Sequence, residues 1–182
     1  MRPIGYLFKR VAQRPDWLAA QNVEDIYSLS GCMSKDFADY INYWRHNGFW
    51  LFDSPSIIRD TARQNGISLE GLKLFYYEAH ELQYDDEQHI WIPFEPEQSF
   101  PTDIQAPVNV ALEGFDVTSF YAGTSPECSP LSCNGCATEI PTNRHCLFPT
   151  FEAAKQALES GKFANAEPGP YRIIGVYSVR NA

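Results

Sequence analysis

The amino-acid sequence predicts an α+β protein, built mostly of antiparallel sheet with about three helices. Short runs of aromatic and aliphatic residues, typical of strands, alternate with segments that carry helix caps. The acidic pair Asp85-Asp86 separates two such runs, 73–84 and 89–94, as the turn of a β-hairpin does. Glycines follow the helical segments at the positions where a helix commonly ends.

In the first half, residues 4–11 predict a strand because aromatic and aliphatic side chains dominate them. Ser34 is a good N-cap for a helix over 35–46. The apolar stripe of this helix follows i, i+3, i+4, i+7 spacing: Phe37, Tyr40, Ile41 and Trp44. A buried strand is expected at 49–52, followed by a helix over 55–64 that begins with a serine cap and a proline.

In the second half, four prolines between residues 93 and 107 favour an extended connector. We expect an N-terminal α/β lobe at 1–92, a proline-rich connector at 93–112, and a C-terminal lobe at 113–182 that carries a cysteine-rich loop. The two lobes are expected to pack as one compact domain. The C-terminal lobe should hold a strand near 114–121, a helix over 150–160 and a last strand over 171–179.

Two segments of the chain share one plan. Leu51-Phe52 and Leu147-Phe148 each precede a hydroxyl cap, an amphipathic helix and a glycine, with a constant offset of 96 positions. This pattern predicts two pseudo-repeated β-x-β-α-β lobes. The alternative is that the match arises by chance, because a strand followed by a capped helix and a glycine is a common arrangement.

Composition excludes some classes of function. Fourteen basic residues face 23 acidic ones, so the formal net charge is −9, which disfavours nucleic acid and anionic membrane surfaces as partners. The first residues lack the apolar run of a secretory signal, which predicts a soluble, cytoplasmic protein. Five cysteines in a reducing compartment predict free thiols or a metal site.

The loop from 127 to 146 contains four of the five cysteines. Zinc prefers four soft or borderline ligands, and a C-x-x-C turn supplies two of them. One interpretation is therefore a zinc-stabilised module whose ligands come from Cys128, Cys133, Cys136, His145 and Cys146. Zinc is the only cofactor that the sequence suggests.

Two other interpretations of this loop remain open. Cys133 could act as a nucleophile, with His145 as base and Asn143 as orienting group, because a thiol needs a base or a positive field to ionise. Alternatively, the cysteines are small apolar residues in a structured loop. The preceding segment 28–32 is interpreted as ordinary loop and capping chemistry.

A second candidate catalytic pair lies on the strand predicted over 73–84. Glu78 and His80 are two residues apart and therefore share one face of the strand. In a cleft, the carboxylate and the imidazole could do acid–base work. The competing interpretation is a solvated strand face.

The leading functional expectation is a binding protein without chemistry of its own. Its acidic, aromatic surface would engage a protein partner, for example as an immunity-type inhibitor of a basic protein. The residues expected on that surface are Asp85, Asp86, Glu87, Trp91, Glu95 and Glu97. The alternatives are the zinc module and an enzyme with a Cys/His or Glu/His site.

Overall fold

The computed structural model describes residues 1–33, 47–120 and 127–180. The predicted α+β class is confirmed. The strands are β1 (Arg2–Lys9), β2 (Ala12–Gln13), β3 (Asp25–Ile26), β4 (Lys73–Asp85), β5 (Ile90–Pro93), β6 (Val110–Ser119) and β7 (Tyr171–Val179). The helices are α1 (Pro55–Gln64), α2 (Pro130–Cys133) and α3 (Phe151–Glu159), with a short 3-10 helix η2 (Cys136–Thr138).

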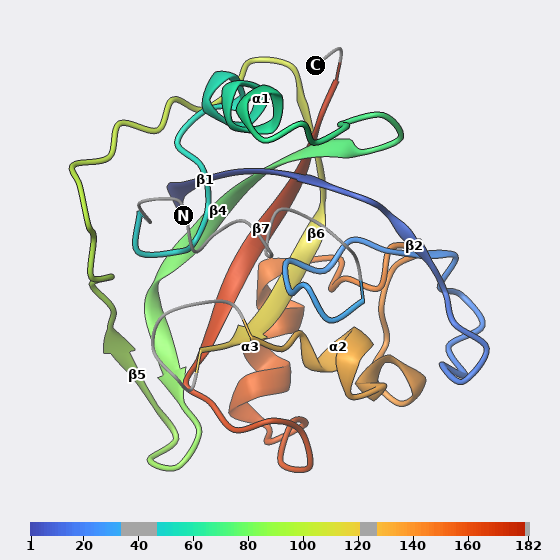
Figure 1. Ribbon diagram of the computed structural model, residues 1–182. Helices are drawn as coiled ribbons and strands as arrows, with labels where there is room; N and C mark the ends of the chain where they lie inside the picture. The colour runs from blue at the N-terminus through green and yellow to red at the C-terminus, as the bar shows by residue number, and fades with distance from the viewer. Residues whose placement is uncertain (34–46, 121–126, 181–182) are drawn as a thin grey trace.

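One antiparallel sheet organises the molecule. Its order is β1-β4-β7-β6, and β5 pairs with the far end of β4 as the predicted hairpin. The central pair, β4 with β7, joins a strand from each predicted lobe. The connector from 94 to 109, which contains no helix or strand, runs around the edge of the molecule past α1 to reach β6 (Figure 1).

The two longer helices confirm the cap-based predictions. The Ser54 side chain accepts a hydrogen bond from the backbone N–H of Ile57 at 3.4 Å at the start of α1. The Thr150 side chain accepts one from Ala153 at 3.1 Å at the start of α3. Each hydroxyl satisfies a backbone donor that the first helical turn leaves unpaired.

Several predicted elements differ from the structure. The strand predicted at 49–52 is wrong, because only Phe52 pairs, through an isolated bridge to Tyr6. The first strand ends at Lys9, and the next two-residue strand pairs with β3 in a separate ribbon. The predicted helix 35–46 lies outside the described residues.

Each face of the sheet has its own cover. On one face, Arg59 of α1 lies over the Phe8 ring, and Phe151 of α3 packs edge-on against His80 at 4.9 Å. On the opposite face, Tyr27 packs against Phe75 at 5.0 Å, and α2 lies against β6. Lys9 follows Phe8 in β1, and successive side chains of a strand point to opposite faces, so Lys9 lies on this second face. No helix within the described residues has the length and apolar character needed to cross a membrane.

The structure adds correspondences to the sequence match between the halves. The Asn47 side-chain oxygen accepts from the N–H groups of residues 49 and 51, and its amide donates to the carbonyl of Ile4. Asn143, 96 positions later, accepts from residues 145 and 147 and donates to the carbonyl of Glu113. Trp50 and Cys146, also 96 apart, both have positive φ, at 56° and 60°.

Two glycines extend this correspondence into the sheet. Gly5 and Gly114 have φ of 133° and 149°, and both lie at a register shift of their strand. Gly5 is paired with Tyr77 and Gly114 with Val176, and these two partners are paired with each other across β4 and β7. The two glycines therefore occupy equivalent positions on either side of that central pair, which supports an internal repeat.

Candidate functional site: a cavity lined by three cysteines

Three of the five cysteines line one cavity on the face of the sheet opposite α1 and α3. Its volume is about 600 Å³. The lining residues are Cys32, Met33, Glu127, Cys128, Cys133, Asn134 and Glu167. Cys32 comes from the segment after β3, whereas Cys128 lies two residues before α2 and Cys133 is the last residue of α2, almost 100 positions later. The fold therefore brings together thiols that are distant in sequence.

A buried lysine fixes the segment that carries Cys32. Lys9 is 2 % exposed, and its ammonium donates hydrogen bonds to the carbonyls of Ser28, Leu29 and Ser30 at 2.6, 2.8 and 3.0 Å. A buried ammonium needs such acceptors because water no longer solvates it. The segment 28–30 is thus held against β1.

A buried carboxylate holds the same segment from the other side. Asp116 is fully buried, and its Oδ2 accepts from the Leu29 N–H at 2.8 Å and from the Ser129 hydroxyl at 2.7 Å. Burial raises the pKa of Asp116 to about 6, although these hydrogen bonds act in the opposite direction. Asp116 therefore couples the Ser28–Ser30 segment to the residue that begins α2.

Cys133 lies where these two segments meet. The Ser30 hydroxyl is 3.4 Å from the Cys133 sulfur, and the Cys128 side chain lines the same cavity. The neighbouring Cys128 thiol is the main cause that lowers the pKa of Cys133, to about 5, and its effect outweighs that of burial. Cys133 is therefore the thiol that ionises first in this cavity.

The pKa values of the other two thiols are raised instead of lowered. The contact with Cys133 and burial hold the pKa of Cys128 far above the ordinary range, and the Cys128 sulfur lies 3.1 Å from Asn134 Oδ1, as a donor does. Burial raises the pKa of Cys32, whose sulfur donates to the Glu127 carbonyl at 3.2 Å. Among the three thiols that line the cavity, Cys133 is therefore the one whose pKa is lowered.

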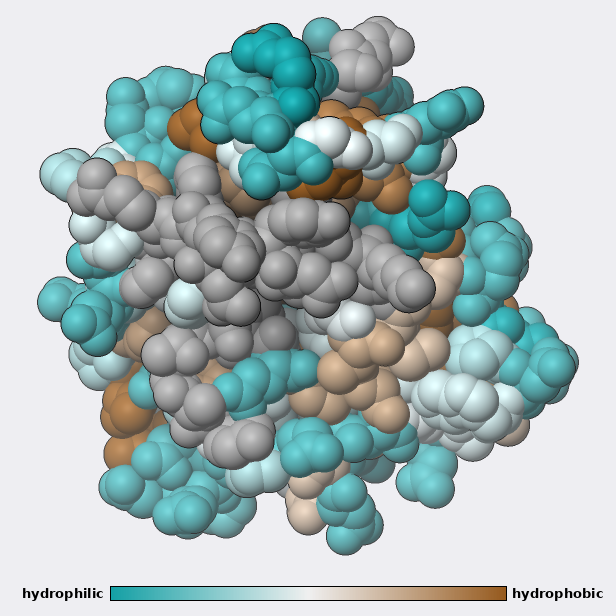
Figure 2. Space-filling view, viewed as in Figure 1, coloured by the Kyte–Doolittle hydropathy of each residue, from teal (hydrophilic) through white to brown (hydrophobic). Residues whose placement is uncertain are grey.

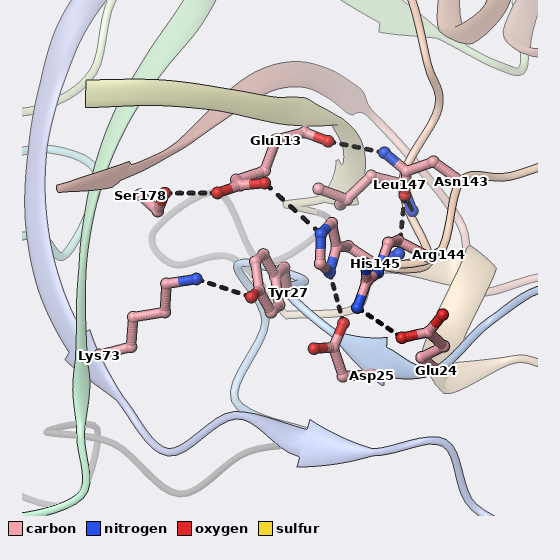
Figure 3. Close-up of polar contacts among 10 residues, drawn as sticks. All are labelled: Glu24, Asp25, Tyr27, Lys73, Glu113, Asn143, Arg144, His145, Leu147 and Ser178. Carbon is pink, nitrogen blue, oxygen red and sulfur yellow. Dashed lines mark hydrogen bonds and ion pairs between the residues drawn. The ribbon is translucent and has the colours of Figure 1, made fainter. Parts of the chain in front are cut away.

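His145 does not serve Cys133 as a base. Figure 3 shows its ring between two carboxylates: Nδ1 lies 2.5 Å from Asp25 Oδ1, and Nε2 lies 3.5 Å from Glu113 Oε2. Tyr27 stacks on the ring at 4.0 Å between centroids and accepts a hydrogen bond from Lys73 at 2.6 Å. This polar cluster ties β3 and the 143–147 loop to β6.

The remaining members of the predicted catalytic and metal sets are also separated. The Asn143 side chain forms hydrogen bonds with backbone groups, as described above, and so does not orient an imidazole. Cys146 is fully buried in the core, and burial raises its pKa to about 12. Cys136 opens onto a different cavity, which Lys162 also lines.

The described residues contain no group of three or more His, Cys, Asp and Glu side chains arranged to hold a metal ion. Of the five cysteine and histidine ligands considered for zinc, only Cys128 and Cys133 lie together. The turn between Cys133 and Cys136 forms as expected, since Gly135 has φ of 72°. The turn directs its two cysteines to different cavities instead of one tetrahedral site.

Glu78 and His80 share a strand face, as predicted, but they do not form a pair. The Glu78 carboxylate accepts hydrogen bonds from Tyr76 at 3.0 Å and from Tyr177 at 2.9 Å. His80 instead lies among aromatic rings, and burial lowers its pKa. The face is partly covered by α3 instead of being fully solvated, which corrects the competing interpretation.

The hairpin surface predicted for a partner is partly used within the chain. Asp85 Oδ1 accepts from the N–H groups of Glu87 and Gln88, which shapes the turn. The Trp91 indole donates to Glu159 at 2.9 Å and is half-buried. The exposed carboxylates of this surface are Glu87, Glu95 and Glu97, and Asp86 is half-buried.

Sequence reasoning missed three contributors to the cysteine cavity: Cys32, Lys9 and Asp116. A serine–proline pair at 129–130 signals the start of α2, but nothing local connects that helix to residues 28–32. Comparison of the chain with family models, with curated proteins and with solved structures found no match.

Proposed function

We propose that this chain is a thiol-dependent enzyme in which the Cys133 thiolate attacks an electrophilic atom of a small molecule. The observation that carries this proposal is the convergence of Cys32, Cys128 and Cys133 on one open cavity. A thiolate, rather than a thiol, is the reactive form of cysteine. The lowered pKa of Cys133 agrees with that role.

The surroundings of Cys133 support nucleophilic chemistry without a histidine. The Cys128 thiol and the Ser30 hydroxyl, which lies 3.4 Å from the sulfur, both act to lower the pKa of Cys133. Lys9 and Asp116 keep Ser30 in place, although neither of them lines the cavity. They are therefore positioning residues, whereas Cys133 is the candidate catalytic residue.

The first test is the pH dependence of alkylation by iodoacetamide, measured residue by residue with peptide mass analysis. Because the pKa of Cys133 is lowered to about 5, we expect Cys133 to react at pH 6 at close to its rate at pH 8. An ordinary thiol with a pKa near 8.5 is less than about 1 % ionised at pH 6. Cys136, whose pKa is raised by burial, provides the internal comparison.

Two variants complete this test. Cys133→Ser should abolish the fast phase at pH 6, whereas Cys136→Ser should leave it unchanged. A Cys133 that alkylates at pH 6 no faster than free cysteine would contradict the proposal.

A second candidate function is binding of a basic protein, and the charge distribution favours it. Glu87, Glu95 and Glu97 are exposed, and none of them takes part in an ion pair with another described residue. On the face shown in Figure 2, hydrophilic residues predominate around the outline, and hydrophobic residues form scattered patches. A net charge of −9 would speed the encounter with a cationic partner.

This second candidate predicts a salt-dependent interaction located at the hairpin and connector. The chain should bind one or more members of a panel of basic proteins, and replacing Glu87, Glu95 and Glu97 with glutamine should weaken binding at least about tenfold at low salt. The matched control replaces Asp16, Glu70 and Glu139, which are also exposed, with the corresponding amides. Binding would be measured by titration calorimetry. Equal weakening by both triple variants would show that net charge alone, and not the hairpin and connector surface, determines binding.

A further inference from the structure

We infer that the cysteine cavity is a hydroperoxide-reducing dithiol site, in which Cys133 is the attacking sulfur and Cys128 is the thiol that closes a disulfide with it. This inference rests on the proposed nucleophilic role of Cys133 and adds the substrate class and the second thiol. Cys32, at the exposed side of the same cavity, is not required for the disulfide.

The position of Cys128 makes it the better partner for Cys133. Cys128 lies two residues before the four-residue helix α2, Cys133 is the last residue of that helix, and both side chains line the cavity. Cys128 is 4 % exposed and Cys133 is more accessible, so an external reagent meets Cys133 first. Cys32 is exposed, and its sulfur points to the carbonyl of Glu127.

The lining of the cavity favours a small, neutral electrophile. Glu127 and Glu167 both face the cavity beside the thiolate, which disfavours anionic substrates such as phosphoesters or oxidised glutathione. Asn134, which lines the cavity, places a polar side chain next to the Cys128 sulfur, where its amide N–H can donate to a peroxide oxygen. A hydroperoxide satisfies both requirements.

The reaction balances as two steps. In the first, the Cys133 thiolate attacks the terminal oxygen of the hydroperoxide, an S–O bond forms, and the O–O bond breaks. The alkoxide or hydroxide that leaves takes a proton from water, so Cys133 becomes a sulfenic acid and the peroxide is reduced by two electrons. In the second, Cys128 attacks the Cys133 sulfur, the S–O bond breaks, and hydroxide leaves with the Cys128 proton as water. An external dithiol returns both cysteines to thiols and is itself oxidised to a disulfide.

The test treats the full reduced chain with one equivalent of hydrogen peroxide, alkylates the free thiols and cleaves after glutamate. Cleavage after Glu127 and Glu139 releases 128–139, which contains Cys128, Cys133 and Cys136. We expect this peptide to be lighter by two hydrogens, with only Cys136 alkylated, and to regain both thiols after treatment with dithiothreitol. Oxidation should be at least about tenfold faster than that of free cysteine.

Three variants sharpen the test. Cys128→Ser should stop at a Cys133 sulfenic acid that dimedone traps, whereas Cys32→Ser and Cys136→Ser should still form the disulfide. The sulfenic acid keeps the inference testable even if Cys128→Ser lowers stability, because it is detected by mass.

Several results would overturn the inference. They are a crosslink between Cys133 and the peptide that carries Cys32, a link between Cys133 and Cys136, or faster oxidation by oxidised glutathione than by hydrogen peroxide. Fast alkylation of Cys133 at pH 6 without a Cys128–Cys133 disulfide would refute only this inference. Slow alkylation at pH 6 would refute the proposed nucleophile as well.

Discussion

Gly114→Ala should reduce the free energy of unfolding by about 3–5 kcal/mol. A Cβ at this position would lie 2.7 Å from the carbonyl oxygen of Phe148 and 2.8 Å from both the Asn143 amide nitrogen and the Leu147 Cβ. The φ of 149° is in addition a conformation that L-residues rarely adopt. Urea unfolding followed by fluorescence would measure the loss.

The chain offers matched comparisons for this change. Gly5→Ala should have a similar effect, because its Cβ would lie 2.7 Å from both the Phe52 oxygen and the Leu51 Cβ. Gly66→Ala should cost only about 1–2 kcal/mol, since Gly66 also has positive φ but has no heavy atom within 4 Å of the added carbon. Equal losses at Gly114 and Gly66 would show that backbone strain, and not the close approach of the loop, sets the requirement for glycine.

Lys9→Met is the second change with a large expected effect, a loss of about 3–5 kcal/mol in the free energy of unfolding. Methionine fills a similar volume but leaves the buried carbonyls of residues 28–30 without the ammonium donor. Because Ser30 then loses its anchor beside Cys133, alkylation of Cys133 at pH 6 should also slow. Chemical denaturation and the alkylation assay would measure the two effects on the same sample.

An exposed lysine supplies the control for that change. Lys162→Met removes a charge from the surface and should alter stability by less than about 0.5 kcal/mol. If Lys9→Met were as mild as Lys162→Met, the three carbonyl contacts would not contribute to holding the cavity together.

The elements that sequence predicted well are those with local signals. Ser54 and Pro55 are adjacent residues that mark the start of one helix, and Thr150 and the glycine at 161 mark the two ends of another; both helices form where expected. The hairpin of β4 and β5 was equally predictable from its acidic turn. The segment 49–52 was not, because its apolar side chains serve a loop that Asn47 organises.

The candidate site depended on contacts that no local pattern encodes. Cys133 was identified as a nucleophile from its loop, but its supposed partner His145 is engaged by Asp25 and Glu113. Its observed neighbours, Cys32 and Ser30, are separated from it by about 100 positions. Only the pairing of strands across the sheet brings these segments together. Pairing between segments so far apart in the chain cannot be inferred from the spacing of residues in the sequence.

The short bridges beside β1 and β6 bear on how this chain behaves at high concentration. Tyr6 exchanges backbone hydrogen bonds with Phe52, and Phe115 does so with Phe148, on the outer sides of the two border strands. Unpaired strand borders are where foreign strands add and fibrils begin. With those donors and acceptors already occupied by its own loops, this protein should resist strand addition until the loops beside Asn47 or Asn143 detach.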